Sequence, residues 1–325
     1  MLQPAGVGIG HNPPTYLKSG DEVVVSVSGL GRLTNRIGAL DGQNPTMARL
    51  ESSLTPRLPI GQRGIELIDG KPLHVKQTGD KSGLPAVFIH GLGGAVDYWT
   101  PLVSSPSLQS WNCLLFDLEG HGLSPTVPSS KLSIESFASD VKSLCSESGI
   151  TGVTLVAHSM GCLVALKCAE ENPDLVSKLI LVGPPPNPLP EAGVQGSQAR
   201  AALVRAEGMD AVVDAVSTAG TSDRTKSSNL VALSAVRTSL LGQASEGYAK
   251  ACTALAESPT LDLGSIKAKT VIITGAEDKV SSPQVCEGYK HKLPNVVHVE
   301  LLEDVGHWHV FEDPAGVLRG IGKLV

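Results

Sequence analysis

The chain has 325 residues and a formal net charge of −6, and its basic residues are scattered along the sequence. This length allows one sizeable domain with a short additional piece, and the scattered charge argues against a nucleic-acid-binding surface. No segment is apolar for long enough to span a bilayer, and the N-terminus lacks the basic and apolar regions of a secretory signal. We therefore expect a cytoplasmic protein without a membrane or nucleic-acid partner.

Six cysteines are spread over the sequence, without a CxxC pair or a Cys/His group at zinc-ligand spacing. They are Cys113, Cys145, Cys162, Cys168, Cys252 and Cys286. Cysteines in such positions usually act as small buried hydrophobic residues in a reducing compartment. The sequence therefore predicts buried thiols and no metal site.

The first part of the chain differs from the rest. Residues 22–28 contain alternate valines, which favours a strand. Residues 41–60 belong to a loose stretch rich in Gly, Pro, Ser and Thr, which is typical of a linker. We therefore divide the chain into an extension (1–40), a linker (41–60) and a main domain (61–325).

In the main domain, strand patterns alternate with helix patterns. Strands are expected at 66–68, 73–75, 86–89, 113–116, 153–156, 179–182, 270–273 and 296–301, and helices at 134–147, after 161 to about 171, and at 312–324. Asp69-Gly70 predicts a hairpin turn between the first two strands. Strand signals disappear from about 185 to 264, where helical spacing predicts an insertion or lid. This order predicts an α/β fold with a mostly parallel sheet and helices on both faces.

Ser159 is the candidate nucleophile. It stands between an expected strand and an expected helix, in Ala157-His158-Ser159-Met160-Gly161. A nucleophile elbow, G-x-S-x-G, requires this context, and Ala157 replaces its first glycine here. The alternative role is that of a helix N-cap, which is the commonest role of a serine at a helix start. An acid and a histidine that follow in the right order favour the nucleophile.

His307 is the candidate general base, since it lies between the last strand and the last helix. The order serine, acid, histidine is that of an elbow-type hydrolase. His309 is the second choice, and His298 falls inside a strand. Asp278, at the carboxyl end of the 270–273 strand, is the candidate acid that orients the histidine. Its alternative role is that of a turn former or a helix cap.

Two backbone N–H groups are expected to hold the oxyanion that develops during acyl transfer. One belongs to Met160, which follows the serine, and the other to Leu92 in His90-Gly91-Leu92-Gly93-Gly94. Glycines let this loop approach a substrate closely. The loop lacks G-x-x-x-x-G-K-S/T and G-x-G-x-x-G, so the sequence predicts no nucleotide site.

Taken in order, these motifs resemble the α/β-hydrolase superfamily from about Gly61 to Val325. The resemblance rests on 90–94, Asp117-Leu118-Glu119-Gly120-His121-Gly122-Leu123-Ser124, the elbow, 275–278 and Gly306-His307. It implies the α/β-hydrolase fold with a helical lid. The serine excludes the epoxide hydrolases and haloalkane dehalogenases of this fold, which would need an aspartate at position 159.

Within the expected insertion, residues 200–209 and 247–255 look like the lid of 3-oxoadipate enol-lactonases. That resemblance implies Arg200 and Arg205 as candidate substrate contacts, together with Trp308 beside the histidine. A solvated helix face is the alternative for both arginines. Residues 216–220 depart from the Arg-Trp-Phe run that this family would show.

Residues 6–38 resemble the C-terminal end of fumarylacetoacetate-hydrolase-type proteins. The metal-binding acids of that family lie elsewhere in its fold, so no metal site is implied. A piece this short cannot bury its own core. It could pack on the main domain, remain partly disordered, support a homo-oligomer or be the remnant of a fusion.

The sequence thus predicts a serine hydrolase that opens a small-molecule ester or lactone through an acyl-enzyme, without a cofactor. Two alternatives remain: a carbon–carbon hydrolase of ring-cleavage products, and a small-molecule receptor that keeps a hydrolase pocket. Fold analogy alone does not choose among them.

Overall fold

The computed structural model describes residues 18, 20–27, 31–36 and 63–324. By its internal contacts the chain divides into two units, residues 1–55 and 56–325. The predicted linker at 41–60 lies outside the described residues, and so does much of the segment 6–38. The resemblance of that segment to fumarylacetoacetate-hydrolase-type proteins stays a prediction.

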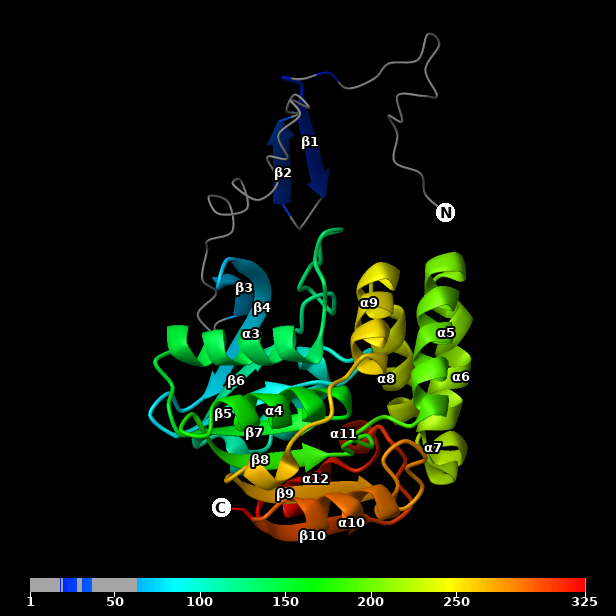
Figure 1. The fold of residues 1–325 in the computed structure, drawn as a ribbon. Coiled ribbons are helices and arrows are strands. Elements are labelled where there is room, and N and C mark those ends of the chain that lie inside the picture. Colours follow the sequence, from blue (N-terminus) through cyan, green and yellow to red (C-terminus); the bar gives the residue numbers. More distant parts are fainter. Residues whose placement is uncertain (1–17, 19, 28–30, 37–62, 325) are drawn as a thin grey trace. The chain divides into compact units, whose positions relative to one another are not determined.

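The first unit contains an antiparallel hairpin of β1 (Glu22–Val27) and β2 (Gly31–Arg36) (Figure 1). Glu22 pairs with Arg36 at one end and Val27 with Gly31 at the other. The expected strand at 22–28 is confirmed. β2 was not predicted, because its sequence GRLTNR has no alternating apolar pattern.

The second unit is built on an eight-stranded sheet in the order β10-β9-β8-β7-β5-β6-β4-β3. The strands are β3 (Arg63–Ile68), β4 (Lys71–Gly79), β5 (Leu84–Ile89), β6 (Trp111–Phe116), β7 (Val153–His158), β8 (Val176–Val182), β9 (Lys269–Gly275) and β10 (Val296–Leu302). Strands β5 to β10 pair in parallel, whereas β3–β4 is the antiparallel hairpin that Asp69-Gly70 predicted. Asp69 and Gly70 both have positive φ, as a two-residue hairpin turn requires. The predicted α/β-hydrolase fold is confirmed.

Helices cover both faces of this sheet, because side chains of a strand alternate between its faces. Leu155 of β7 belongs to an apolar core with α3 (Ile134–Glu147) and α4 (Met160–Glu171), whereas Val156 belongs to a second core on the other face. The first face also carries α10 (Pro283–Lys292), and the second carries α2 (Thr100–Val103) and α12 (Pro314–Ile321). All six cysteines are free and buried in this unit, as expected.

The closing helix differs from the prediction at 312–324. It is divided into α11 (His309–Glu312) and α12, because Pro314 has no N–H to continue a helix. The carboxylate of Asp313 instead accepts the N–H of Gly316 at 2.9 Å and caps α12. α10 was not predicted at all, since only Cys286 and Tyr289 of its ten residues are buried.

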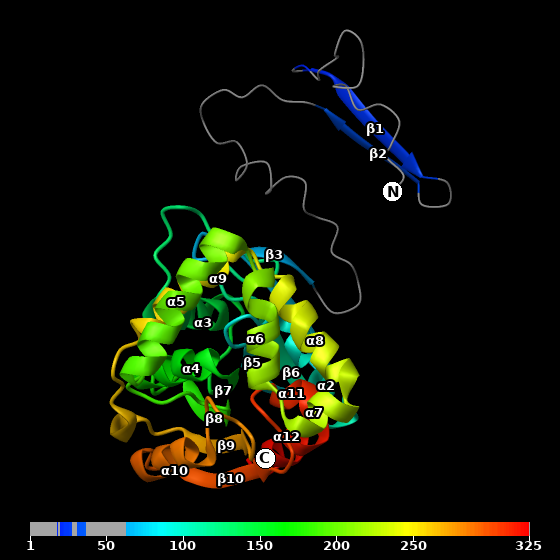
Figure 2. The ribbon, with the colours of Figure 1, turned by 90° about the vertical axis from the view of Figure 1, so that its right-hand side faces the viewer.

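Five α-helices lie between β8 and β9, where the sequence predicted an insertion at about 185–264. They are α5 (Glu191–Glu207), α6 (Asp210–Gly220), α7 (Asp223–Ser228), α8 (Leu230–Leu241) and α9 (Ser245–Ala256). We call these five helices the helical insertion. They stack beside the sheet at the ends toward which the parallel strands point (Figures 1 and 2). In parallel α/β sheets this edge is where ligands bind.

Candidate active site

Ser159 occupies a strained turn between β7 and α4. Its φ is 51° and its ψ −124°, a conformation that residues other than glycine rarely adopt. Its side chain makes no hydrogen bond to the helix that it precedes, so it does not act as an N-cap. Close packing explains Gly161, where a Cβ would lie 2.5 Å from the carbonyl oxygens of Ile89 and His90. The turn therefore presents the hydroxyl of Ser159 away from the helix backbone.

A hydrogen-bonded chain links Ser159 to two other side chains. Nε2 of His307 lies 2.8 Å from Oγ of Ser159, and Nδ1 of His307 lies 2.8 Å from Oδ2 of Asp278. His307 comes from the loop between β10 and α11, and Asp278 from the loop after β9. With its proton on Nδ1, His307 donates to the carboxylate and leaves Nε2 free to accept the serine proton.

The carboxylate of Asp278 is held in its ionised form. Burial would raise its pKa, but the charge and hydrogen bond of His307 and the backbone N–H of Ser281 lower it well below the usual range. Oδ1 of Asp278 accepts the N–H groups of Val280 and Ser281, each at 2.8 Å. These two bonds leave Oδ2 directed at His307.

The competing residues of the sequence are placed differently. Nε2 of His309 accepts the N–H of Gly275 at 3.1 Å and lies 3.4 Å from Oδ2 of Asp278. Burial lowers the pKa of His309 to about 4, so its ring stays neutral near pH 7. His298 pairs with Glu300. Glu277, which precedes Asp278 in the chain, accepts the N–H of Asp223 instead. Only His307 of these histidines is hydrogen-bonded to Ser159.

Two backbone N–H groups beside Ser159 have no protein acceptor among the hydrogen bonds of residues 63–324. They belong to Met160, the first residue of α4, and to Leu92, in the loop after β5. Gly91 brings this loop close to the nucleophile, because a Cβ there would lie 2.8 Å from Cβ of Ser159. Both are the N–H groups expected to hold an oxyanion.

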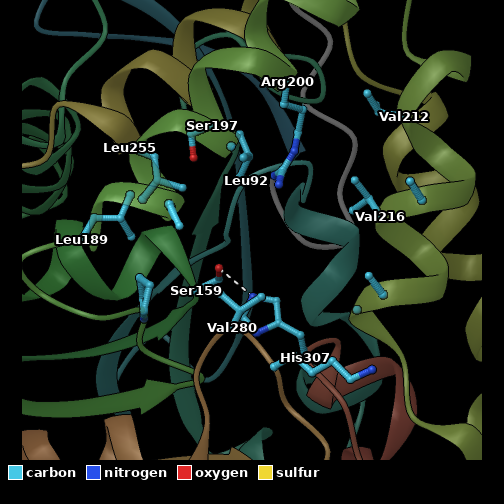
Figure 3. Close-up of a pocket in the computed structure, with 18 of the residues that line it drawn as sticks. Leu92, Ser159, Leu189, Ser197, Arg200, Val212, Val216, Leu255, Val280 and His307 are labelled. Carbon is cyan, nitrogen blue, oxygen red and sulfur yellow. Dashed lines mark hydrogen bonds between the residues drawn. The ribbon is translucent and has the colours of Figure 1, made fainter.

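A cavity of about 780 Å³ opens onto Ser159 and His307 (Figure 3). Its volume lies within the range of small-molecule sites. Apolar and small side chains of the helical insertion form much of its wall. Examples are Ala192, Gly196, Leu203, Val212 and Val216, and Leu189 adds to the wall from the loop before α5. The cavity therefore suits an organic ligand with a largely apolar body.

The three candidate substrate contacts separate in the structure. Arg200 and Trp308 line the cavity, and the guanidinium of Arg200 points from α5 into it (Figure 3). Arg205 does not line it; its Nε lies 2.8 Å from Oε2 of Glu246, in an exposed pair. The solvated face that was the alternative for Arg205 is the one observed.

Arg200 is a charged group in a mostly apolar place. Burial would lower its pKa, but the neighbouring Tyr248 and Cys252 raise it, so the guanidinium remains charged. Among the described residues, no carboxylate forms a salt bridge with it. The Arg200 side chain is half-buried and hydrogen-bonds Tyr248, and a guanidinium that faces a cavity without a salt bridge can bind an anionic or strongly polar ligand group there.

Residues 85–314 match the model of the alpha/beta hydrolase fold family. The chain belongs to this family. Solved structures agree: an esterase from Thermogutta terrifontis is 25% identical with a TM-score of 0.72, over 78% of this chain and 92% of its own. The enol-lactonase of Burkholderia xenovorans LB400 is 24% identical with a TM-score of 0.71, over 80% and 98%, and shows the fold alone.

Curated relatives of this α/β hydrolase match over shorter stretches. A probable lysophospholipase of Arabidopsis thaliana, BODYGUARD 1, is 33% identical over 126 residues, which is 37% of this chain and 27% of that protein. A putative carbamate hydrolase, RutD of Variovorax paradoxus, is 30% identical over 144 residues, or 44% and 54%. The matches thus span from about a quarter to about half of these relatives.

The motif at 117–124 holds loops beside the site in place through hydrogen bonds of Asp117. Oδ1 of Asp117 accepts the N–H of Val96 at 2.6 Å, and Oδ2 accepts the N–H of Leu123 at 2.8 Å and contacts Nδ1 of His74 at 2.7 Å. These bonds join the loops that follow β5 and β6.

No helix in the described part of the chain has both the length and the apolar character needed to cross a bilayer.

Proposed function

We propose that this α/β hydrolase is a serine hydrolase that cleaves a small-molecule carboxylic ester or lactone through an acyl-enzyme. The observation that carries the proposal is the continuous chain Ser159–His307–Asp278, with 2.8 Å at both links, at the floor of a 780 Å³ cavity. The esterase among its structural neighbours is consistent with this class of substrate.

In the proposed reaction, Oγ of Ser159 attacks the substrate carbonyl while Nε2 of His307 takes its proton. The N–H groups of Leu92 and Met160 stabilise the resulting oxyanion. His307 then protonates the leaving alkoxide as the acyl bond breaks. A water molecule, deprotonated by His307, then attacks the acyl carbonyl, and His307 returns that proton to Oγ of Ser159 as the acid leaves. Asp278 stabilises the imidazolium throughout, and the chemistry requires no cofactor.

The proposal is tested by reaction of the full chain with a fluorophosphonate probe, followed by peptide mapping of the adduct. We expect one adduct, on Ser159, and turnover of members of a panel of esters and lactones. A folded protein that does not react would contradict the proposal and favour a receptor with a hydrolase pocket. Turnover confined to a dienol substrate, followed by its absorbance, would indicate a carbon–carbon hydrolase.

Arg200 and Trp308 are the proposed substrate contacts. Trp308 follows His307 directly and forms part of the cavity wall, so it would contact the apolar body of a substrate. The guanidinium of Arg200 would bind a carboxylate or another anionic group carried by the acyl or lactone part. An acidic ester or lactone is therefore the preferred substrate class within the proposed function.

Replacing Arg200 by methionine should raise KM for a carboxylate-bearing ester about 10- to 100-fold. This range corresponds to the loss of a hydrogen bond to a charged group, about 1.5–3 kcal/mol. The KM of the neutral methyl ester of the same acid should change little. Arg205→Met is the matched control, because it removes a guanidinium from the same helix outside the cavity. An equal effect of Arg200→Met on both substrates would contradict the contact.

A further inference from the structure

We propose that Glu312 is a positioning residue that holds the loop of His307 in register with Ser159 and ties that loop to the helical insertion. This inference rests on the proposed function, since it concerns the same His307. Glu312 is the last residue of α11, and its side chain is 2% exposed. It does not line the cavity, so it acts through other residues.

The carboxylate of Glu312 brackets His307 on both sides. Its Oε1 accepts the N–H of Trp308 at 3.1 Å, and its Oε2 accepts the N–H of Gly306 at 3.1 Å. The N–H groups of the residues before and after His307 are thereby held by one carboxylate. The carbonyl oxygen of His307 is held as well, because it lies 2.8 Å from Nε2 of His158.

The same carboxylate reaches the helical insertion. Its Oε2 also accepts the N–H of Ser222 and the hydroxyl of Thr225, each at 2.8 Å. Both residues belong to the junction that follows α6 and begins α7. A further bond crosses the same boundary, from the N–H of His307 to the carbonyl oxygen of Gly220 at 2.8 Å. Glu312 thus connects the loop that carries His307 to the part of the helical insertion between α6 and α7.

The donors at Glu312 explain why a carboxylate rather than an amide stands here. A buried carboxylate without hydrogen bonds is very costly, but four donors converge on this one. No Lys or Arg of the described residues forms a salt bridge with it. Its two oxygens instead accept three backbone N–H groups and one hydroxyl. A glutamine has only one acceptor oxygen, and its NH₂ would oppose either Trp308 or the donors at Oε2.

The test compares Glu312→Gln with wild type in the full chain. We expect kcat for an ester to fall about 100-fold, because a misplacement of about 1 Å is enough for such a loss, while KM stays near its wild-type value. The rate of fluorophosphonate labelling should fall in parallel. In a proton NMR spectrum, the low-field resonance of the His307 Nδ1–H bonded to Asp278 should shift or broaden.

The control is Asp140→Asn, which changes a carboxylate that is also 2% exposed but lies on α3 and pairs with Lys71. It should lower the melting temperature and leave kcat and the low-field resonance unchanged. This separates positioning of His307 from a general effect of altering a buried carboxylate. Thr225→Val is the second variant, since it keeps the side-chain shape and removes the hydroxyl that donates to Glu312 and accepts from Ser222. We expect it to lower kcat several-fold.

The proposal is overturned if folded Glu312→Gln keeps wild-type kcat and an unchanged low-field resonance. If Glu312→Gln does not fold, Thr225→Val decides, and a wild-type kcat with an unchanged resonance overturns the proposal. If wild type is neither labelled nor active, the proposed function fails instead. The resonance then still tests whether Glu312 positions His307, because it reports the His307–Asp278 bond without any turnover.

Discussion

Replacing Ser159 by alanine should lower kcat for ester hydrolysis by about 10⁶-fold, the loss observed when the serine of a comparable triad is removed. Alanine leaves His307 without a nucleophile to deprotonate, and no neighbouring thiol can replace it. Cys162 lies closest in sequence, but burial raises its pKa well above the usual value and its Sγ is directed at the carbonyl oxygen of Ala157. Initial rates on the preferred ester measure the effect.

The matched control for Ser159→Ala is Ser177→Ala. Ser177 lies near the start of β8, at the end of the sheet opposite to the cavity, and its hydroxyl bonds the carbonyl oxygen of Gly152. This variant should keep wild-type kcat. A purified, folded Ser159→Ala protein with activity within tenfold of wild type would contradict the assignment of the nucleophile.

Asp278→Asn should lower kcat by about 10⁴-fold near neutral pH, by the mechanism known for such triads. The N–H groups of Val280 and Ser281 both point at Oδ1, so the oxygen of the asparagine amide should occupy that position. Its NH₂ group then faces Nδ1 of His307. The proton of the imidazole must move to Nε2, where the ring can no longer accept the proton of Ser159.

Glu277→Gln is the control for this variant, because it makes the same chemical change at the adjacent residue. Glu277 accepts the N–H of Asp223 and forms no hydrogen bond or ion pair with His307 in the described part of the chain. We expect kcat within about twofold of wild type, as for substitutions away from the site. Equal losses for Glu277→Gln and Asp278→Asn would show that the carboxylate of Asp278 has no special role.

The local signals of this sequence predicted much of the fold. Apolar runs bounded by turn residues indicated the strands of the parallel sheet, and α3 begins and ends where the spacing of its apolar residues predicted. β2 and α10 were missed because their faces are mostly polar, so no periodic apolar pattern marks them. The order of Ser159, Asp278 and His307 along the chain predicted that their side chains meet. All three follow strands of the parallel sheet, and the ends of such strands lie at the same edge.

Contacts between distant segments could not be predicted in the same way. Glu312 hydrogen-bonds residues about 90 positions earlier, and no local pattern in the sequence predicts that Ser222 or Thr225 is its partner.

Arg200 and Arg205 are a different case, because local geometry could have distinguished them. Residues five apart on a helix are about 140° apart around its axis, so the two guanidinium groups could not both face the cavity. Helical geometry alone could therefore have separated these two candidates.

The wall of small residues in the cavity has an evolutionary consequence. A Cβ added at Gly196 would meet no atom within 4 Å, so larger side chains there could reshape the cavity from α5 alone. At Gly220 the opposite holds, since a Cβ would lie 2.9 Å from Nε1 of Trp308, next to the loop of His307. Descendants of this chain could thus acquire new substrates through one wall of the insertion while inheriting the nucleophile and its partners intact.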